Sequence, residues 1–539
     1  MSDSNNSAHQ CDAIVVGAGF AGMYMLHKLR GLGLSVKVFE TGSGVGGTWF
    51  WNRYPGARCD VDSLEYSYQF SEELQQDWHW PERYSAQPDI LEYANHVAER
   101  FDLRKDIQFN TRVESAIYNE SSKGWDVTTS DGKRQSAQFC IMATGCLSST
   151  NTPDFKGLDS FKGDTYHTGN WPHKAVDFRG KRVGIIGTGS SAIQAIPEIA
   201  KQAEQLYVFQ RTPNYTVPSN NTPMNKETEA RVKADYIGFR ERNSKMPAGA
   251  GADSGRQTDR SVSALDVSHE QRTQEYESRW ETAGLSIGGS YGDLMLNQKS
   301  NDTIAEFARG KIRQIVEDPT TAEALCPEQT FACKRLCVDT GYYQTFNQPH
   351  VTLVDISKGA IDQITPAGLE ANGDDFELDC IIFATGFDAM TGALLSADIR
   401  GEGGLTLTEK WSAGPRTYLG LGTSGFPNLF TITGPGSPSV LTNMIPSIEQ
   451  HVNWIADCIQ YMKDSNLSTI NVTDDAENSW VEHVNELASH TLYPSCNSWY
   501  LGANVPGKPR VFMPHIGFPA YVEKCNTVAA NGYQGFALA

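Results

Sequence analysis

Two stretches of the chain share one hydrophobic pattern: an apolar run leads into a glycine-rich turn and then into residues that are apolar at helical spacing. The first is AIVVGAGFAG (13–22), which a second apolar run, SVKVFE (35–40), follows. The second is RVGIIGTGSSAIQAIPEIA (182–200), which QLYVFQR (205–211) follows. Each pattern is typical of a strand, a helix and a second parallel strand. We therefore predict an α/β fold with two Rossmann-like dinucleotide-binding domains.

The glycines of the first turn have the spacing of a dinucleotide fingerprint. Gly17 permits a tight turn, Gly19 lets the backbone approach a pyrophosphate, and Gly22 lets helix and strand pack closely. The start of the helix offers free N–H groups to the phosphates. Glu40 follows Gly17 at the position whose carboxylate accepts hydrogen bonds from a free ribose 2′-hydroxyl. The first site therefore suits the adenosine of FAD.

The second turn differs at the residue that reads the ribose. Gly187 and Gly189 are followed by Ala192 in place of the third glycine, which the looser fingerprint allows. The position equivalent to Glu40 is Gln210, and Arg211 comes next. An arginine binds a 2′-phosphate by charge-assisted pairing, so the second site suits NADPH over NADH. The alternative for Arg211 is a solvated charge at a strand end.

The remaining pattern divides the chain into segments of the two domains. About a hundred polar residues with helical periodicity follow Pro213 and predict a helical insertion. The runs FCIMATG (139–145) and CIIFATGFD (380–388) end in Ala-Thr-Gly, as expected where the chain crosses between nucleotide domains. We predict FAD-domain segments 1–150 and 376–539, NADP-domain segments 151–215 and 326–375, and the insertion at 216–325. Within the insertion, residues 246–260 are a flexible loop by composition, either a spacer or a lid.

Composition narrows the possible partners. The chain has 539 residues and a net charge of −19, which disfavours nucleic acid and anionic membrane surfaces as partners. We see no signal peptide and no run long enough to span a membrane. The eleven cysteines are an odd number without framework spacing, which favours reduced thiols and a cytoplasmic location. Cys326, Cys333 and Cys337 lack C-x-x-C pairs and nearby histidine, so we expect no metal.

Two further motifs resemble those of the type I Baeyer–Villiger monooxygenases, a class of flavoprotein monooxygenases. FKGDTYHTGNWP (161–172) fits F-x-G-x-x-x-H-x-x-x-W-P, and GGTWFWNRYPGARCD (46–60) is similar to the family's other long motif. The resemblance extends over nearly the whole chain, and GPGSPSVLTNM (434–444) looks like the phenylacetone, cyclohexanone and steroid monooxygenase group. This resemblance implies that NADPH reduces FAD, that O₂ then forms a C4a-peroxyflavin, and that a ketone is converted to an ester or lactone.

The resemblance also assigns catalytic roles. Arg335 maps to the family's essential arginine, Asp60 to the carboxylate that pairs with it, and Lys334 to an NADP contact. From the sequence alone, Asp60 and Arg335 could equally form a structural salt bridge. Trp499 maps to a mobile-loop residue that contacts NADP. We expect His167 to be no proton-transfer catalyst; a hydrogen bond to backbone is as good an interpretation as a mechanistic role.

The predicted site residues can now be stated in full. Arg335 and Asp60 are the predicted catalytic residues, and Leu441 and Met444 are predicted to line the substrate pocket. Tyr66 is a plausible flavin contact, with a core aromatic as the alternative, and Val113 lies in a small antiparallel insertion under the flavin adenine. The predicted cofactor contacts are Gly17, Gly19, Phe20, Gly22, Glu40, Gly47, Thr48, Trp49, Asp60, Tyr66, Val113, Gly187, Thr188, Gly189, Ser190, Ser191, Gln194, Arg211, Thr212, Lys334, Arg335 and Trp499.

Three alternative functions stay open at this point. A flavin monooxygenase that oxidises amine nitrogen or sulfide sulfur shares both glycine-rich turns, although Trp171-Pro172 favours the ketone reaction. A pyridine-nucleotide reductase is disfavoured because no redox cysteine pair is visible. A non-enzymatic flavin-binding protein leaves Asp60 and Arg335 without a purpose. We expect O₂ and a small ketone as partners and a monomer or weak homo-oligomer; the sequence does not identify the ketone.

Overall fold

The first domain is built on an eight-stranded sheet with the first glycine-rich turn at its centre. The computed structural model describes residues 9–253, 259, 261–282 and 284–539. The strand order is β17-β4-β5-β6-β1-β2-β3, and β18 also pairs with β6. These strands are β1 (Cys11–Val16), β2 (Val36–Phe39), β3 (Ile107–Gln108), β4 (Val113–Asn119), β5 (Gly124–Thr129), β6 (Arg134–Met142), β17 (Asp398–Arg400) and β18 (Leu429–Thr431). The antiparallel pairs β4–β5 and β5–β6 form the small insertion that contains Val113.

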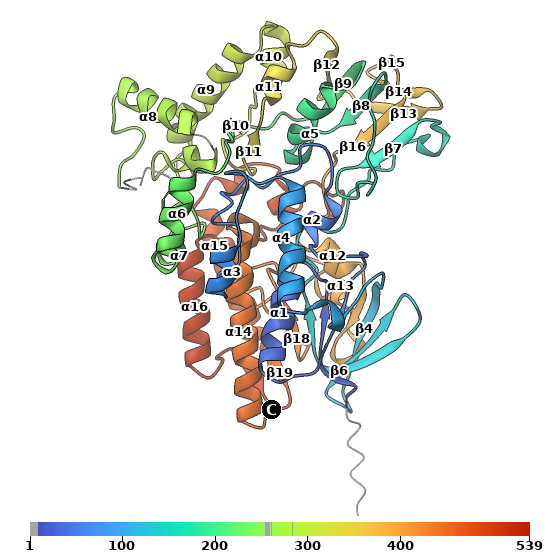
Figure 1. The fold of residues 1–539 in the computed structure, drawn as a ribbon, viewed down its shortest axis with the longest axis vertical. Coiled ribbons are helices and arrows are strands. Elements are labelled where there is room, and N and C mark those ends of the chain that lie inside the picture. The colour runs from blue at the N-terminus through green and yellow to red at the C-terminus, as the bar shows by residue number, and fades with distance from the viewer. Residues whose placement is uncertain (1–8, 254–258, 260, 283) are drawn as a thin grey trace, which may run out of the picture.

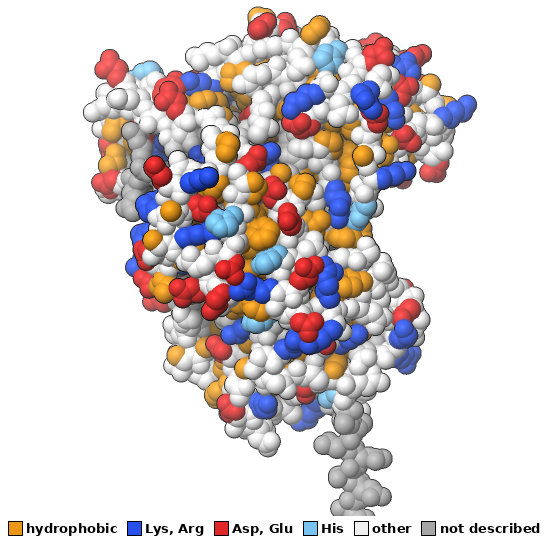
Figure 2. All heavy atoms as spheres, viewed as in Figure 1, with side chains coloured by type: hydrophobic (Ala, Val, Ile, Leu, Met, Phe, Trp, Pro, Cys, Tyr) orange, Lys and Arg blue, Asp and Glu red, His pale blue; other side chains and the backbone are white. Residues whose placement is uncertain are grey.

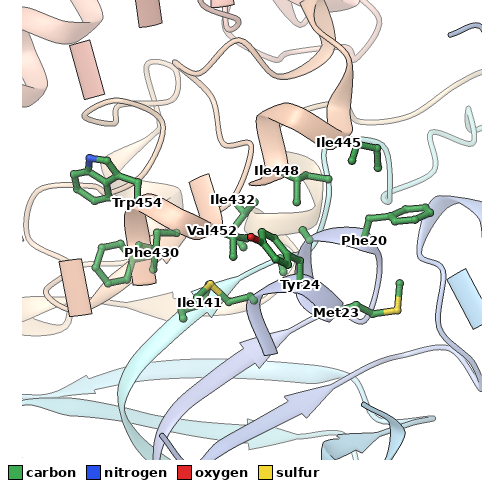
Figure 3. Close-up of a cluster of buried hydrophobic side chains, with 14 of the residues drawn as sticks. Phe20, Met23, Tyr24, Ile141, Phe430, Ile432, Ile445, Ile448, Val452 and Trp454 are labelled. Atoms are coloured by element: carbon green, nitrogen blue, oxygen red, sulfur yellow. The ribbon is translucent and has the colours of Figure 1, made fainter. Parts of the chain in front are cut away.

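Helices from both ends of the chain cover this sheet (Figure 1). Helix α1 (Phe20–Gly31) packs against α14 (Met444–Asp464), and Figure 3 shows Tyr24 of α1 beside Val452 of α14. Burial of such side chains supplies most of the stabilising free energy. The domain also contains α2 (Thr48–Trp51), α3 (Glu72–Asp77), α4 (Gln87–Arg100), α12 (Gly392–Leu395), α13 (Leu407–Lys410), α15 (Asp474–Ser489) and α16 (Phe518–Ala530), and a two-stranded antiparallel sheet of β19 (Ile470–Val472) and β20 (Phe536–Leu538).

The second domain is a five-stranded, all-parallel sheet with the order β12-β9-β8-β16-β7. Its strands are β7 (Asp164–His167), β8 (Arg182–Ile186), β9 (Gln205–Gln210), β12 (Val351–Asp355) and β16 (Cys380–Phe383), and its helices include α5 (Ser190–Ala200) and α11 (Tyr342–Thr345). A three-stranded antiparallel sheet, β13 (Ile361–Thr365), β14 (Gly368–Ala371) and β15 (Asp374–Glu377), follows β12. The strand β16 lies inside the second sheet, past the predicted boundary at 376. We therefore propose that the chain returns to the first domain after Phe383.

The insertion is mainly helical, with α6 (Lys226–Ala234), α7 (Tyr236–Ser244), α8 (His269–Thr282), α9 (Gln298–Ile315) and α10 (Pro319–Leu325). Strands β10 (Thr216–Pro218) and β11 (Cys337–Asp339) pair where the chain leaves and re-enters the second domain. Arg240 of α7 is buried and donates hydrogen bonds to Gln75, Ser67 and the carbonyl of Glu65, which joins the insertion to the first domain.

The segment predicted as a flexible loop, 246–260, is described only in part, since residues 254–258 and 260 lie outside the described residues. Its first part packs against the first domain. Asn443 N–H donates to the carbonyl of Ala248 at 2.8 Å, and Gly251 N–H donates to Glu65 Oε1 at 2.9 Å. Residues 248–251 therefore cover the start of α14, beside Met444.

The structure corrects one expectation about the cysteines. Cys333 and Cys496 form a disulfide, with 6.3 Å between their Cα atoms. The odd number of cysteines without framework spacing predicts reduced thiols throughout, and no spacing pattern connects two residues 163 positions apart. The nine other cysteines are free and buried. Residues of the described part of the chain form no cluster suited to a metal ion.

The distribution of surface charge and the character of the helices concern the expected absence of nucleic-acid and membrane partners. On the face drawn in Figure 2, acidic and basic side chains are interspersed. Among helices of the described residues, none has both the length and the apolar character needed to cross a bilayer.

Gly22 gives a test of the packing at the first turn. A Cβ at Gly22 would overlap the carbonyl oxygen of Gly17, whereas a Cβ at Gly31 of the same helix would meet nothing within 4 Å. Gly22→Ala should cost about 1–3 kcal/mol through overpacking. Gly31→Ala should be neutral or stabilise by up to about 1 kcal/mol, from helix propensity. Thermal melts and flavin content of the two variants measure this; equal behaviour of both variants would contradict the proposed packing role of Gly22.

Candidate active site

One cavity of about 1860 Å³ lies between the two sheets and is lined by both glycine-rich turns. A pocket for a single drug-sized ligand is about 300–1,000 Å³, so this cavity has room for more than one ligand. Of the predicted cofactor contacts, all but Gly22 line it. Gly22 instead packs against the turn, as its predicted role requires.

The first turn has the geometry of a phosphate cradle. Gly17 has φ +105°, and a Cβ there would lie 2.6 Å from the carbonyl oxygen of Ala143. Gly19 faces Gly47 of the long motif, where a Cβ would lie 2.9 Å from the Cα of Gly19. No side chain caps the start of α1, so its N–H groups face the cavity. Two separate motifs thus form one narrow backbone channel that fits a pyrophosphate.

Glu40 holds the same turn together from the end of β2. Its carboxylate accepts hydrogen bonds from the N–H groups of Ala18 and Gly42, both at 2.7 Å. Burial raises the pKa of Glu40, and these two donors oppose that rise. Glu40 also lines the cavity, which leaves it positioned to accept a hydrogen bond from a ribose hydroxyl.

The second turn repeats this geometry. Gly187 has φ +111°, and a Cβ there would lie 2.5 Å from the carbonyl oxygen of Ala384. A Cβ at Gly189 would meet nothing within 4 Å, and α5 begins without a side-chain cap. The Asn214 side chain donates to the carbonyl of Thr188, while its buried Oδ1 has no partner in the described structure. An unpaired buried oxygen on the cavity wall fits a missing hydrogen-bond donor. Asn214 is not among the predicted cofactor contacts, because no residue of the fingerprint marks its position.

Two cations meet beside the second turn. Arg211 and Lys334 both line the cavity. Burial lowers the pKa of Lys334, and the charge of Arg211 lowers it further. Within the described residues, no carboxylate forms an ion pair with either of them. A bound phosphate would relieve their mutual repulsion, so this pair fits the 2′-phosphate predicted from Arg211.

An ion pair joins the two sides of the cavity. Arg335 Nε and Nη2 each donate to a carboxylate oxygen of Asp60 at 2.9 Å, and Nη1 donates to the carbonyl of Val440 at 2.8 Å. The exposed fractions are 25% for Arg335 and 22% for Asp60. Burial alone would lower the pKa of Arg335, but Asp60 reverses this and raises that pKa above its ordinary value. The guanidinium therefore stays charged at any working pH.

Neutral hydrogen bonds also connect the domains. Gln194 of α5 accepts from Tyr54 Oη at 2.9 Å and donates to the carbonyl of Arg58 at 3.2 Å. Gln194 is predicted only as a cofactor contact. The structure shows that its side chain also holds the motif that carries Asp60.

His167 lies where the chain crosses between the domains. Its Nδ1 accepts from Gly169 N–H at 3.0 Å, and its Nε2 lies 3.4 Å from both the carbonyl of Asn151 and Thr385 Oγ1. Burial lowers the pKa of His167. Asn151 and Thr385 belong to the two crossing segments, so the imidazole joins them through one backbone and one side-chain contact, and it does not line the cavity.

Apolar side chains line part of the cavity. Val440, whose carbonyl accepts from Arg335, lines it together with Thr442, Met444 and Trp499. Leu441, predicted to line the pocket, does not; it packs against the core of the first domain instead. Residues 439–441 form a helical turn, so adjacent residues face different directions. Tyr66 lines the cavity and accepts a hydrogen bond from Trp49 Nε1 at 3.1 Å.

The comparisons with known proteins agree with this geometry. Residues 11–223 match the family model "Flavin-binding monooxygenase-like". A Baeyer–Villiger monooxygenase of Pseudooceanicola batsensis is 43% identical over 97% of this chain and 95% of its own length. This chain belongs to the Baeyer–Villiger monooxygenases. The solved structure of an oxidised steroid monooxygenase bound to NADP superposes on this member of the family with a TM-score of 0.93 and 50% identity, covering 98% of this chain and 99% of that one.

One relative has a different reaction in its name. A phenazine N-monooxygenase of Lysobacter antibioticus is 40% identical over 99% of this chain and 98% of its own length. Membership of the Baeyer–Villiger monooxygenases therefore does not by itself decide which atom of a substrate is oxygenated.

Arg211 gives a test of the second nucleotide site. Arg211→Ala should raise the Kd for NADPH by about tenfold or more, through loss of a charge-assisted phosphate contact, and leave the Kd for NADH unchanged. Fluorescence titration of the flavin-loaded protein measures both. Lys201→Ala removes an exposed cation at the end of α5 that pairs with Glu198, and serves as the control. Equal losses for NADPH and NADH would exclude a 2′-phosphate contact.

Proposed function

We propose that this chain catalyses the NADPH- and O₂-dependent oxidation of ketones to esters or lactones. The observation that carries the proposal is the bidentate Asp60–Arg335 pair inside the cavity that both glycine-rich turns share. A flavin-binding protein without catalysis has no need of a fixed charge at that point. Membership of the Baeyer–Villiger monooxygenases supports the reaction class.

Each turn is assigned one cofactor. Gly17, Gly19 and Glu40 would hold the pyrophosphate and adenosine ribose of FAD, with Tyr66 and Trp49 near the flavin. Gly187, Gly189, Asn214, Arg211 and Lys334 would hold NADPH. When bound, FAD that NADPH has reduced supplies activated oxygen from O₂.

The protein's own contribution is charge, orientation and exclusion of water. Arg335 would stabilise the negative charge that develops on the ketone oxygen, and as a permanent cation it does not donate a proton to an oxygen anion. Asp60 and the Val440 carbonyl fix the guanidinium in one orientation. Trp499 and Met444 would cover the reacting region with apolar surface, which strengthens the field of Arg335.

We also propose which class of ketone is the substrate. The apolar wall near Arg335 and the likeness to a steroid monooxygenase support bulky cyclic or aryl ketones. Because the reaction consumes NADPH, we also propose a cytoplasmic location, and we propose a monomer or weak homo-oligomer.

N-oxygenation is the second candidate, favoured by the phenazine N-monooxygenase relative. The two reactions differ in their need for Arg335, because attack on a carbonyl carbon creates an oxyanion and attack by an amine nitrogen does not.

The experiment separates these candidates. The purified protein receives NADPH, air and a panel of cyclic, aryl and steroid ketones together with a sulfide and an aza-aromatic amine. Mass spectrometry should find esters or lactones, and Arg335→Ala should lower their formation by about 100-fold or more with FAD still bound. Arg335→Lys, which keeps the charge but loses the bidentate geometry, should fall between. Only N-oxides or sulfoxides, or only H₂O₂, would reject the ketone reaction.

A further inference from the structure

The Cys333–Cys496 disulfide connects two segments that the proposed function places at the reaction centre. Cys333 directly precedes Lys334 and Arg335. Cys496 begins residues 496–510, here called the Trp499 segment, which contains Trp499 and Tyr500. Cys496 itself lines the cavity. The bond therefore lies at the active site and not in a remote part of the surface.

Apart from this bond, the Trp499 segment has two further attachments. In its middle, Tyr500 is buried beside Arg335 and packs against Tyr493 and Phe512.

The second attachment lies at the other end of the segment. Asn504 Nδ2 donates to the carbonyl of Phe387 at 2.6 Å, and Asn151 Nδ2 donates to the carbonyl of Asn504 at 3.0 Å. Lys508 pairs with Asp388 at 2.5 Å. These contacts attach residues 504–508 to the segments that cross between the domains.

At the Lys334 end, the bond has one polar companion. Thr330 Oγ1 and Ser495 Oγ lie 3.1 Å apart, and both side chains are exposed. An exposed hydroxyl pair gives little net free energy because water competes for it. The covalent bond consequently restrains the distance between Lys334–Arg335 and the first residues of the Trp499 segment, in addition to the packing of Tyr500 beside Arg335.

The two sulfur atoms differ in accessibility. Cys333 is fully buried, whereas Cys496 is partly exposed and borders the cavity. A dithiol can attack Cys496, and a peroxide can oxidise it, without the protein unfolding. Disulfides in the cytoplasm are rare and are usually transient. A reversible Cys333–Cys496 bond therefore fits the proposed cytoplasmic location.

We propose that the Cys333–Cys496 bond positions the Trp499 segment over Lys334 and Arg335, and that its reversible reduction loosens this segment and weakens NADP(H) binding. The proposal rests on the proposed function, since it concerns the same site.

The bond forms in two steps. H₂O₂ oxidises the Cys496 thiolate to a sulfenic acid and leaves hydroxide, and the Cys333 thiol then displaces water and forms the S–S bond. The bond is broken when a dithiol transfers two electrons to it, which gives two protein thiols and converts the dithiol to a disulfide. Hydrogen peroxide is a by-product that uncoupled oxygen-activating turnover releases.

The first measurement is the bond itself. Non-reducing peptide mass spectrometry of the flavin-loaded protein, after brief exposure to H₂O₂, should find a peptide pair that contains Cys333 and Cys496 and disappears after treatment with a dithiol. The other nine cysteines should be alkylated only after unfolding, because they are buried. Both thiols alkylated after H₂O₂ exposure would overturn the proposal.

The second measurement tests the effect of reducing the bond on segment mobility and on NADP⁺ binding, in the absence of turnover. In the presence of NADP⁺, hydrogen exchange of residues 496–510 should be at least about threefold faster in the reduced protein than in the oxidised protein, since the anchoring restraint is lost. The Kd for NADP⁺ should rise by about threefold or more, because the loop must then be ordered on binding. The double variant C333S/C496S should match the reduced protein and should not respond to dithiol.

Cys326→Ala is the matched control, since it removes a free, buried thiol of the same segment and leaves the bond intact. It should respond to dithiol as the unaltered protein does. A bond that forms but whose reduction changes neither hydrogen exchange nor the Kd would overturn the positioning role. Because neither readout needs a ketone, a protein that shows both changes but oxidises no ketone would reject the proposed function alone.

Discussion

The ion pair between Asp60 and Arg335 is the contact on which the arrangement of the two domains depends. Asp60 comes from the long motif that also supplies Gly47 to the first cradle, and Arg335 comes from the segment that supplies Lys334 to the second. Because both side chains are about three-quarters buried, separating them would leave two charges poorly solvated, at a cost of several kcal/mol. The domain orientation that satisfies the pair is the orientation in which both cradles open into one cavity.

The neutral contacts between the domains have a different physical character. Gln194 with Tyr54, and His167 with Asn151 and Thr385, are hydrogen bonds of 2.9–3.4 Å, each worth about 1 kcal/mol net. Hydrogen bonds of that strength can break and re-form while the Asp60–Arg335 ion pair keeps the two domains in the same relative position. This gives a physical meaning to the F-x-G-x-x-x-H-x-x-x-W-P stretch. Its histidine holds the two crossing segments together, and its Trp171 N–H donates to the carbonyl of Trp51 at 3.3 Å, next to the first cradle.

The sequence was sufficient for features that depend on local chemistry. Both strand–turn–helix units could be predicted because the glycine spacing and the apolar runs are local constraints, and the resemblance implied the pair of Asp60 and Arg335. Features that depend on which other part of the chain a segment packs against could not be predicted. The apolar run at 380–383 reads as a buried strand in either sheet, and only the structure places it between β7 and β8. Leu441 and Met444 are equally apolar and both pack against the core, and only the folded structure shows that Met444 also lines the cavity. Cys333 and Cys496 are 163 residues apart, and no spacing rule joins them.

The attachments of the Trp499 segment decide how the cavity can open. Water must be excluded during the reaction, yet the nicotinamide cofactor must enter and leave. The attachment near Lys334 is covalent, whereas the attachment at Asn504 and Lys508 consists of hydrogen bonds and one ion pair for which water and salt compete. The less costly movement of the oxidised protein therefore releases residues 504–508 first. Because Tyr500 is buried beside Arg335 and its ring packs against Trp499, both rings stay in place while residues 504–508 open towards solvent.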